Sequence, residues 1–165
     1  MKALVSHFQR MAAYNTGANR ILYEACAELS DSERKQPRPA FFGSIHGTLN
    51  HILLGDRIWM TRFRRREAPS TGLDEILYED FAELREARRA EDAGIEAFMD
   101  GLDERGLAGA ISYINNEGRP MEESLPVLLA HFFNHQTHHR GQVHGLLSQT
   151  DLAPPVLDLH RVLNP

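Results

Sequence analysis

Four long stretches of this chain repeat their apolar residues every three or four positions, which is the period of an amphipathic α-helix. We expect helices at about residues 2–29, 44–65, 80–102 and 125–149, and Ser44 is a suitable N-cap for the second of them. Helices of about twenty residues bury their apolar faces most simply against one another. The sequence therefore predicts an all-α fold, a four-helix bundle.

The segments between these helices contain residues that interrupt helical structure. Residues 30–44 are polar and hold two prolines, and residues 67–73 (EAPSTGL) also break the periodicity. Residues 109–125 combine strand-forming side chains with the turn sequence NNEG, which predicts a short β-hairpin before the last long helix. We expect the tail, residues 151–165, to be a loop with one short helical turn.

Composition indicates an ordinary globular chain and excludes some partners. The 165 residues are 42% hydrophobic and 25% charged, which suits a single domain over residues 1–165. A net charge of −5 gives no reason to expect nucleic acid or a membrane surface as partner. The one basic cluster, residues 62–67 (RFRRRE), lies at an expected helix end, so we interpret it as a solvated helix terminus.

Cysteine usage and the first residues bear on the compartment. Cys26 is the only cysteine, so no intrachain disulfide can form, and its helical apolar surroundings predict a buried structural thiol. The first fifteen residues lack the apolar stretch of a signal peptide, and no segment has the length and hydropathy of a membrane span. We therefore expect a cytoplasmic protein.

Five of the nine histidines lie within fourteen positions of the last expected helix. Successive residues of a helix are separated by about 100°, so each side chain can be assigned to a face. With His135 at zero, His139 falls at about 40°, within a buried face that spans about 20° to 120°. The residues of that face are Leu125, Leu128, Leu129, Phe132, Val143, Leu146 and Leu147. His135 and His139 therefore face inward, His131 and His138 flank them, and His144 faces away.

Histidines four positions apart on one helix can bind one metal ion together. The segment differs from the zincin motif, because Gln136 stands where that motif has its glutamate. No Glu-x-x-His sequence occurs, so a di-iron carboxylate bundle is excluded. Two hydrogen-bonded core histidines without metal are the alternative interpretation of the pair.

A third histidine on the second helix favours the metal interpretation. His51 lies at the border of the apolar stripe of that helix, whereas His46 is about 140° away, toward the polar side. His7 on the first helix is a competing third ligand. Three neutral nitrogen donors between helices leave coordination positions open, which is typical of a catalytic rather than a structural metal site.

The sequences LNHILLGDRIWMTRF (residues 49–63) and HFFNHQTHHRGQVHGLL (131–147) resemble the DinB-like, or damage-inducible, family of bacterial four-helix bundles. The resemblance extends to residues 7–29 and 154–163, nearly the whole chain. It implies an up-down-down-up bundle, frequently a homodimer. It also implies a divalent metal held by one histidine of the second helix and the pair of the last helix. By position these ligands are His51, His135 and His139.

Some relatives in that family are S-transferases that use bacillithiol, mycothiol or glutathione. The resemblance thus implies a low-molecular-weight thiol and a small electrophilic substrate. A three-histidine metal site can lower the pKa of a thiol or of water near neutral pH. Imidazole ligands suit several metals, and we expect zinc or nickel ahead of iron or manganese.

Polar and aromatic residues near the expected histidines are candidates for supporting roles. Gln142 points toward the expected site and could orient a ligand histidine, with Asn134 and Asp56 as further polar neighbours. Arg140 points away from the metal side and could pair with acids on another helix or subunit. Trp59 and Tyr113 are expected in the core or the pocket wall, and His131 and His138 either carry protons or are structural.

Three functional hypotheses follow, and no catalytic residue is assigned. The first is a metal-dependent thiol S-transferase, with a metal-dependent hydrolase that uses water at the metal as its variant. The second is a non-catalytic metal-binding stress protein. The third is a bundle whose core histidines hold no metal. Helical spacing places no additional carboxylate, cysteine or lysine near the histidines, so the sequence does not choose between these hypotheses.

Overall fold

Four long helices make up most of the structure, a computed structural model that describes residues 1–66, 68 and 72–164. They are α1 (Lys2–Ala27), α3 (Ile45–Phe63), α4 (Phe81–Asp100) and α6 (Leu125–Leu147). The shorter elements are α2 (Asp31–Lys35), α5 (Glu104–Leu107), β1 (Ala110–Ile114), β2 (Pro120–Ser124) and α7 (Leu159–Leu163). The four predicted helices are thus confirmed, each ending within about two residues of its expected bounds.

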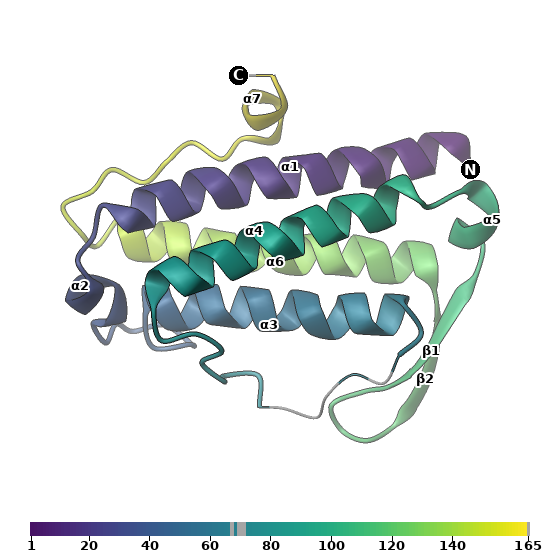
Figure 1. Cartoon of the computed structure of the whole chain (residues 1–165), viewed down its shortest axis with the longest axis horizontal. Coiled ribbons are helices and arrows are strands. Elements are labelled where there is room, and N and C mark those ends of the chain that lie inside the picture. The colour runs from purple at the N-terminus through teal and green to yellow at the C-terminus, as the bar shows by residue number, and fades with distance from the viewer. Residues whose placement is uncertain (67, 69–71, 165) are drawn as a thin grey trace.

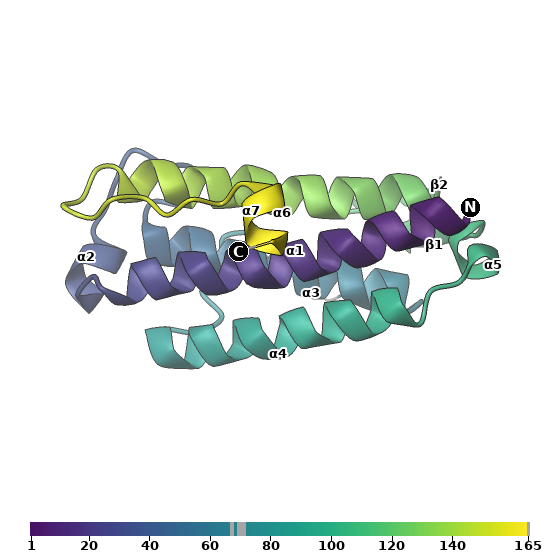
Figure 2. The same ribbon diagram turned by 90° about the horizontal axis from the view of Figure 1, so that it is seen from above.

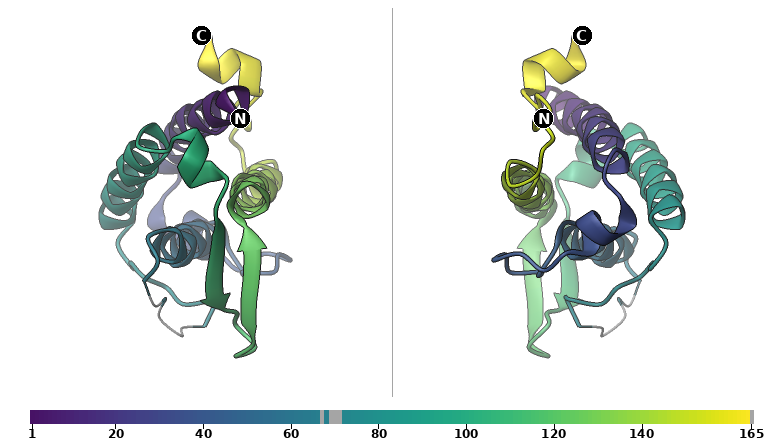
Figure 3. Two further views of the ribbon diagram at one scale, coloured as in Figure 1. Left: turned by 90° about the vertical axis from the view of Figure 1, so that its right-hand side faces the viewer. Right: turned by 90° about the vertical axis from the view of Figure 1, so that its left-hand side faces the viewer.

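The long helices form a bundle with up-down-down-up topology. α3 runs antiparallel to α1, α4 runs parallel to α3, and α6 runs antiparallel to both of them (Figure 1). The end-on views show the helices at the corners of a square in the order α1, α4, α3, α6 (Figure 3). The predicted fold class and topology are confirmed. This arrangement packs α3 directly against α6, the two helices that carry the candidate ligands.

Local capping explains where the helices begin. The Ser44 side chain accepts a hydrogen bond from the backbone N–H of Gly47, and Asp80 caps α4 in the same way. α2 was not predicted; it begins at a capping box formed by Ser30 and Glu33 and ends just before Pro37. α5 was missed as well. Such short helices carry too few residues for a periodicity to be recognised.

The predicted hairpin and tail are confirmed. β1 and β2 pair antiparallel, with Tyr113 opposite Met121, and Gly118 takes the positive φ of 77° that the turn requires. The tail folds back so that α7 lies against α1 (Figure 2), and the Tyr14 hydroxyl donates to the carbonyl of Leu157 at 2.9 Å. Of the predicted break at residues 67–73, residues 67 and 69–71 lie outside the described part of the chain.

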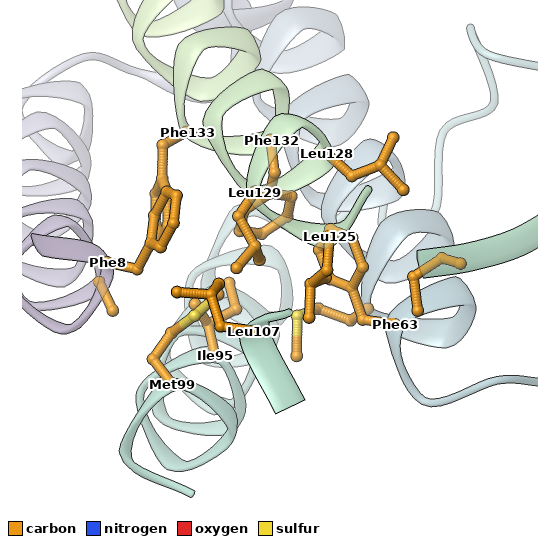
Figure 4. Packing of buried hydrophobic residues seen from close by; sticks show 13 residues of the cluster. Phe8, Phe63, Ile95, Met99, Leu107, Leu125, Leu128, Leu129, Phe132 and Phe133 are labelled. Atoms are coloured by element: carbon orange, nitrogen blue, oxygen red, sulfur yellow. The ribbon is translucent and has the colours of Figure 1, made fainter. Parts of the chain in front are cut away.

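Apolar side chains fill both ends of the bundle. The cluster at the hairpin end takes residues from all four long helices and α5, among them Phe8, Phe63, Ile95 and Leu129 (Figure 4). A second cluster occupies the opposite end and includes Cys26, which is fully buried. Burial raises the pKa of the Cys26 thiol to about 12, so this thiol is structural, as predicted.

A buried polar layer separates the two apolar clusters. Arg88 of α4 forms ion pairs with Asp56 of α3 and with Asp92, and Gln136 of α6 donates to Asp56 at 2.7 Å. Arg140 of α6 donates to the side-chain oxygens of two α1 residues, Asn15 and Asn19. The layer links all four long helices and fixes their relative heights, since a shift of any helix would leave buried polar groups without partners.

Two predictions about charged residues need correction. Arg140 was expected to pair with acids, but it lies inside the bundle and bonds amide oxygens of α1. Arg62 was assigned to a solvated helix end, but it is only 8% exposed, whereas Arg64, Arg65 and Arg66 are exposed as predicted. Within the described residues, no helix is both long enough and apolar enough to cross a membrane.

Candidate metal site

Three histidine rings meet between α3 and α6. The Nε2 atom of His51 lies 3.3 Å from that of His135 and 3.2 Å from that of His139. One nitrogen of each ring can be chosen so that all three lie within 4.8 Å of one another. His51 and His139 are buried and His135 is half-buried. The structure thus brings together the three residues that the sequence selected.

Hydrogen bonds on the far side of two rings determine which nitrogen carries a hydrogen. His51 Nδ1 lies 2.7 Å from the carbonyl oxygen of Leu73, and a carbonyl oxygen can only accept. His139 Nδ1 lies 2.7 Å from Oε1 of Gln142, whose amide nitrogen contacts His138. Both rings therefore carry their hydrogen on Nδ1, and both Nε2 atoms present a bare lone pair to the space between them.

This donor arrangement fits a divalent cation. Two lone pairs that face each other at 3.2 Å repel unless a proton or a cation lies between them. A tetrahedral ion with metal–nitrogen bonds of about 2.0–2.1 Å places its ligand nitrogens about 3.3 Å apart. The separations between the Nε2 atoms of His51 and its two partners match that spacing. Carbonyl or carboxamide acceptors behind ligand histidines are the usual support of such sites.

The surroundings keep the three rings neutral. Burial lowers the pKa of His51 to about 4. Burial, together with the neighbouring His139 and His51, lowers the pKa of His135 to about 3. Burial also lowers the pKa of His139, against the effect of its hydrogen bond to Gln142. Only the neutral imidazole binds a metal, so the rings are ready to bind one at neutral pH.

Close packing restricts the orientation of the His51 and His135 rings. The ring of Phe42, from the loop before α3, stacks on His51 with centroids 3.7 Å apart. Gly55 lies one turn after His51, where a Cβ atom would come within 2.9 Å of Cε1 of His135. A glycine here lets the His135 ring approach the α3 backbone. Phe42 and Leu73 were missed in the sequence, since loops lack a periodicity that would assign them to a site.

A pocket of about 330 Å³ opens beside His51 and His135. It lies between α3, α6 and the hairpin, and its wall includes Trp59, Tyr113 and His131. Trp59 and Tyr113 were expected in the core or in the pocket wall, and the structure places both in the pocket wall. The His131 ring packs edge-on against Trp59, with centroids 5.2 Å apart. One side of the candidate site therefore has room for a small molecule.

The remaining histidines stay outside the cluster. His7, the competing ligand, is exposed on α1. His131 and His138 flank the site as expected, beside the rings of His135 and His139 respectively. His144 is half-buried on another face of α6. His46 does not join the cluster, but its assignment to the polar side was wrong. It is 2% exposed, and its Nε2 lies 2.8 Å from the carbonyl oxygen of Tyr78.

Of the three polar residues expected near the site, Gln142 contacts a ligand histidine, whereas Asp56 and Asn134 do not. Gln142 bonds His139 as expected from its helical position. Asp56 instead belongs to the buried polar layer, and Asn134 is exposed. Gln136, to which the sequence assigned no role, joins α6 to Asp56 of α3. The polar layer therefore positions the helices, and Gln142 positions a ring.

Comparisons with known proteins agree with this fold. The model of the DinB family matches residues 2–165. The chain is similar to protein DinB of Bacillus subtilis (strain 168), at 27% identity over 154 residues that cover 90% of this chain and 89% of the relative.

Two solved structures share the fold. One is YfiT from Bacillus subtilis, described as a probable metal-dependent hydrolase with an unusual four-helix bundle topology; it has a TM-score of 0.70, 12% identity and 86% coverage of both chains. The other is a DinB-like protein from Bacillus cereus ATCC 10987, with a TM-score of 0.63 and 20% identity over 86% of this chain and 91% of that one. The chain belongs to the DinB family.

Proposed function

We propose that this protein is a metal-dependent enzyme in which His51, His135 and His139 hold a divalent cation, with zinc or nickel as the first choice. The reaction we assign to it is S-transfer, in which a low-molecular-weight thiol adds to a small electrophile. A cation held by three imidazoles supplies one thing, a lower pKa for a thiol or water placed beside it.

One observation carries the proposal. The Nε2 atoms of the histidine cluster, which carry no hydrogen on His51 and His139, lie close together beside an open pocket. Two of the rings, His51 and His135, line the pocket of about 330 Å³. A purely structural site surrounds its ion with protein ligands, whereas a catalytic site keeps a position for substrate. The pocket therefore favours an enzyme over a metal-binding protein without activity.

The other residues have defined tasks in this proposal. The Leu73 carbonyl and Gln142 hold the rings of His51 and His139 in the ligand tautomer. Phe42 covers one face of His51 and excludes water there. His131 lines the pocket with its ring centroid 6.1 Å from that of His135, and we assign it the proton that the thiol releases.

Hydrolysis is the second candidate, favoured by the description of YfiT as a probable metal-dependent hydrolase. The same three rings and the same pocket serve both reactions, with water in place of the thiol. The two candidates differ in what binds beside the cation, so a binding measurement separates them.

The test measures metal content and thiol binding on untagged wild type, His139→Ala and the control His7→Ala, which removes an exposed histidine outside the cluster. We expect near-stoichiometric metal in wild type and control, its loss in His139→Ala, and saturable binding of glutathione and 2-mercaptoethanol only by metal-loaded protein. Metal without thiol binding favours the hydrolase. A wild type that holds no metal and takes up neither zinc nor nickel rejects the proposal.

A further inference from the structure

Arg62 places a buried positive charge at the far end of the pocket that holds the histidines. It lies eleven residues after His51 on α3, and His51, Gly55, Trp59 and Arg62 all line the same pocket. Eleven residues of helix rise by about 16 Å, and side chains on a helix lean toward its N-terminus, which brings the guanidinium back toward the histidines. Arg62 is 8% exposed.

The contacts of Arg62 hold its guanidinium in place without neutralising it. The group lies over the rings of Trp59 and Tyr113, 4.8 Å and 4.7 Å from their centroids. Its Nη2 donates to the carbonyl of Ile114 at 3.1 Å and to Oδ1 of Asn116 at 3.2 Å. Its Nε is buried and has no hydrogen-bond partner among the described residues.

The described part of the chain provides no carboxylate for this charge. No described aspartate or glutamate comes within ion-pair distance of Arg62, whereas the equally buried Arg88 has both Asp56 and Asp92. Glu117 is the one acid among the described residues of the pocket wall, and Arg119 pairs with it at 3.3 Å. Buried charges are normally paired, so the missing counter-charge points to a ligand.

A second, larger pocket adjoins Arg62, and its wall contains further positively charged side chains. This pocket, of about 490 Å³, lies between the end of α3 and the hairpin, and Arg62, Arg65 and Arg66 contribute to its wall. Tyr113 lines both pockets. Guanidinium groups bind carboxylates through paired, charge-assisted hydrogen bonds. An anion bound at Arg62 would therefore also be attracted by the guanidinium groups of Arg65 and Arg66.

We infer that the molecule which reaches the three histidines carries a carboxylate, and that Arg62 binds this carboxylate at the hairpin end of the pocket. The inference rests on the proposed function, because it names the class of substrate for that site. The reacting group lies at the histidine end and the carboxylate at the Arg62 end. The distance between these ends then selects for chain length as well as for charge.

The experiment uses cobalt-loaded protein and two matched series of thiols, ω-mercapto carboxylates and ω-mercapto alcohols of increasing chain length. Thiol binding is followed by the thiolate-to-cobalt absorption band. At one chain length we expect the carboxylate to bind roughly 10- to 100-fold more tightly than the alcohol. Arg62→Gln should abolish this advantage and leave the affinity for the alcohols unchanged. Arg64→Gln, at an exposed arginine that lines neither pocket, should leave both unchanged.

A second measurement keeps the inference testable if Arg62→Gln folds poorly or thiols do not bind. Trp59 is the only tryptophan of the chain and lies beside Arg62, so its fluorescence reports on this end of the pocket. Thiol-free alkyl carboxylates should quench or shift this fluorescence more strongly than the matched alcohols, in wild type and in Arg64→Gln. Arg62→Lys, which keeps the charge but loses the paired donors, should show part of the effect.

The outcomes separate the two proposals. If no thiol binds to cobalt but alkyl carboxylates still perturb Trp59 in an Arg62-dependent way, S-transfer is wrong and the carboxylate site stands. If carboxylates and alcohols bind equally at every length and perturb Trp59 equally, the carboxylate site is wrong. An advantage of carboxylates that persists in Arg62→Gln also overturns the inference, because the carboxylate then binds elsewhere.

Discussion

The Nε2 atoms of His51 and His139 lie 3.2 Å apart, and neither carries a hydrogen that could join them. Each ring gives its Nδ1 hydrogen to a separate acceptor, the Leu73 carbonyl for His51 and the Gln142 side chain for His139. The backbone acceptor cannot be removed by mutation, but the side-chain acceptor can. Gln142 is therefore the position from which the donor arrangement can be tested.

Replacing Gln142 by leucine should weaken metal binding by roughly 10- to 100-fold, because His139 loses the acceptor that fixes its tautomer and orientation. Gln142→Glu keeps an acceptor and should retain the affinity. Competition with a chromogenic chelator measures both variants. Gln149→Leu changes an exposed glutamine just beyond α6 and is the matched control. Equal affinities of all four proteins would show that Gln142 does not orient the ring.

Replacing Gly55 by alanine tests whether the His135 ring packs tightly against α3, and replacing Gly141 by alanine is the matched control. Alanine is favoured over glycine in a helix by about 1 kcal/mol. Gly141→Ala meets no neighbouring atom within 4 Å and should raise the free energy of unfolding by about that amount. At Gly55 the added methyl would come within 2.9 Å of His135 Cε1 and push this ring out of position.

We therefore expect Gly55→Ala to lose metal affinity without losing the fold, and Gly141→Ala to keep its affinity. Urea unfolding of the metal-free proteins and calorimetric metal titration measure the two quantities separately. A Gly55→Ala variant that binds metal as tightly as wild type would contradict the close approach of His135 to α3.

The stability of the metal-free protein should fall as the pH decreases below about 6.5. The pKa values of His51 and His135, about 4 and about 3, are lower than the ordinary value of 6.5. The unfolded chain therefore binds protons first, and the stability present above pH 6.5 is lost as the pH falls through the folded pKa values. Urea midpoints measured between neutral pH and pH 4 should show this decline.

The variant His135→Leu provides the control for this pH dependence, since it removes one of the titrating rings. Its unfolding free energy should fall less steeply with decreasing pH than that of wild type. Parallel pH profiles of the two proteins would mean that other groups, such as the carboxylates, account for the whole decline.

Breaking the buried polar layer should be far more costly than breaking an ion pair at the surface. Asp56→Ala leaves Arg88 short of one partner inside the bundle and should lower the free energy of unfolding by about 3–5 kcal/mol. Glu24→Ala removes the exposed Arg20–Glu24 pair and should cost less than about 1 kcal/mol. Urea unfolding measures both. Similar losses would show that the layer contributes no more than a surface pair.

The sequence determined the features that depend on neighbours along the chain. The spacing of apolar residues indicated the four long helices, and Ser44 marked the start of α3. The same angular argument assigned His51, His135 and His139 to inward faces, because the face of a helix is set by local geometry. The position of Gln142 toward the site followed from the same argument.

The tertiary structure alone decided which groups the inward faces and loops contact. Arg62 and His46 were assigned to a solvated or polar side of their helix, and Arg140 to acidic partners on another helix or subunit. All three are buried instead, with hydrogen-bond partners far away in the chain. The partner of His46 is the Tyr78 carbonyl, 32 residues away. Burial of such a group is stable only when its partner arrives from another element, and a single helix contains no information about that partner.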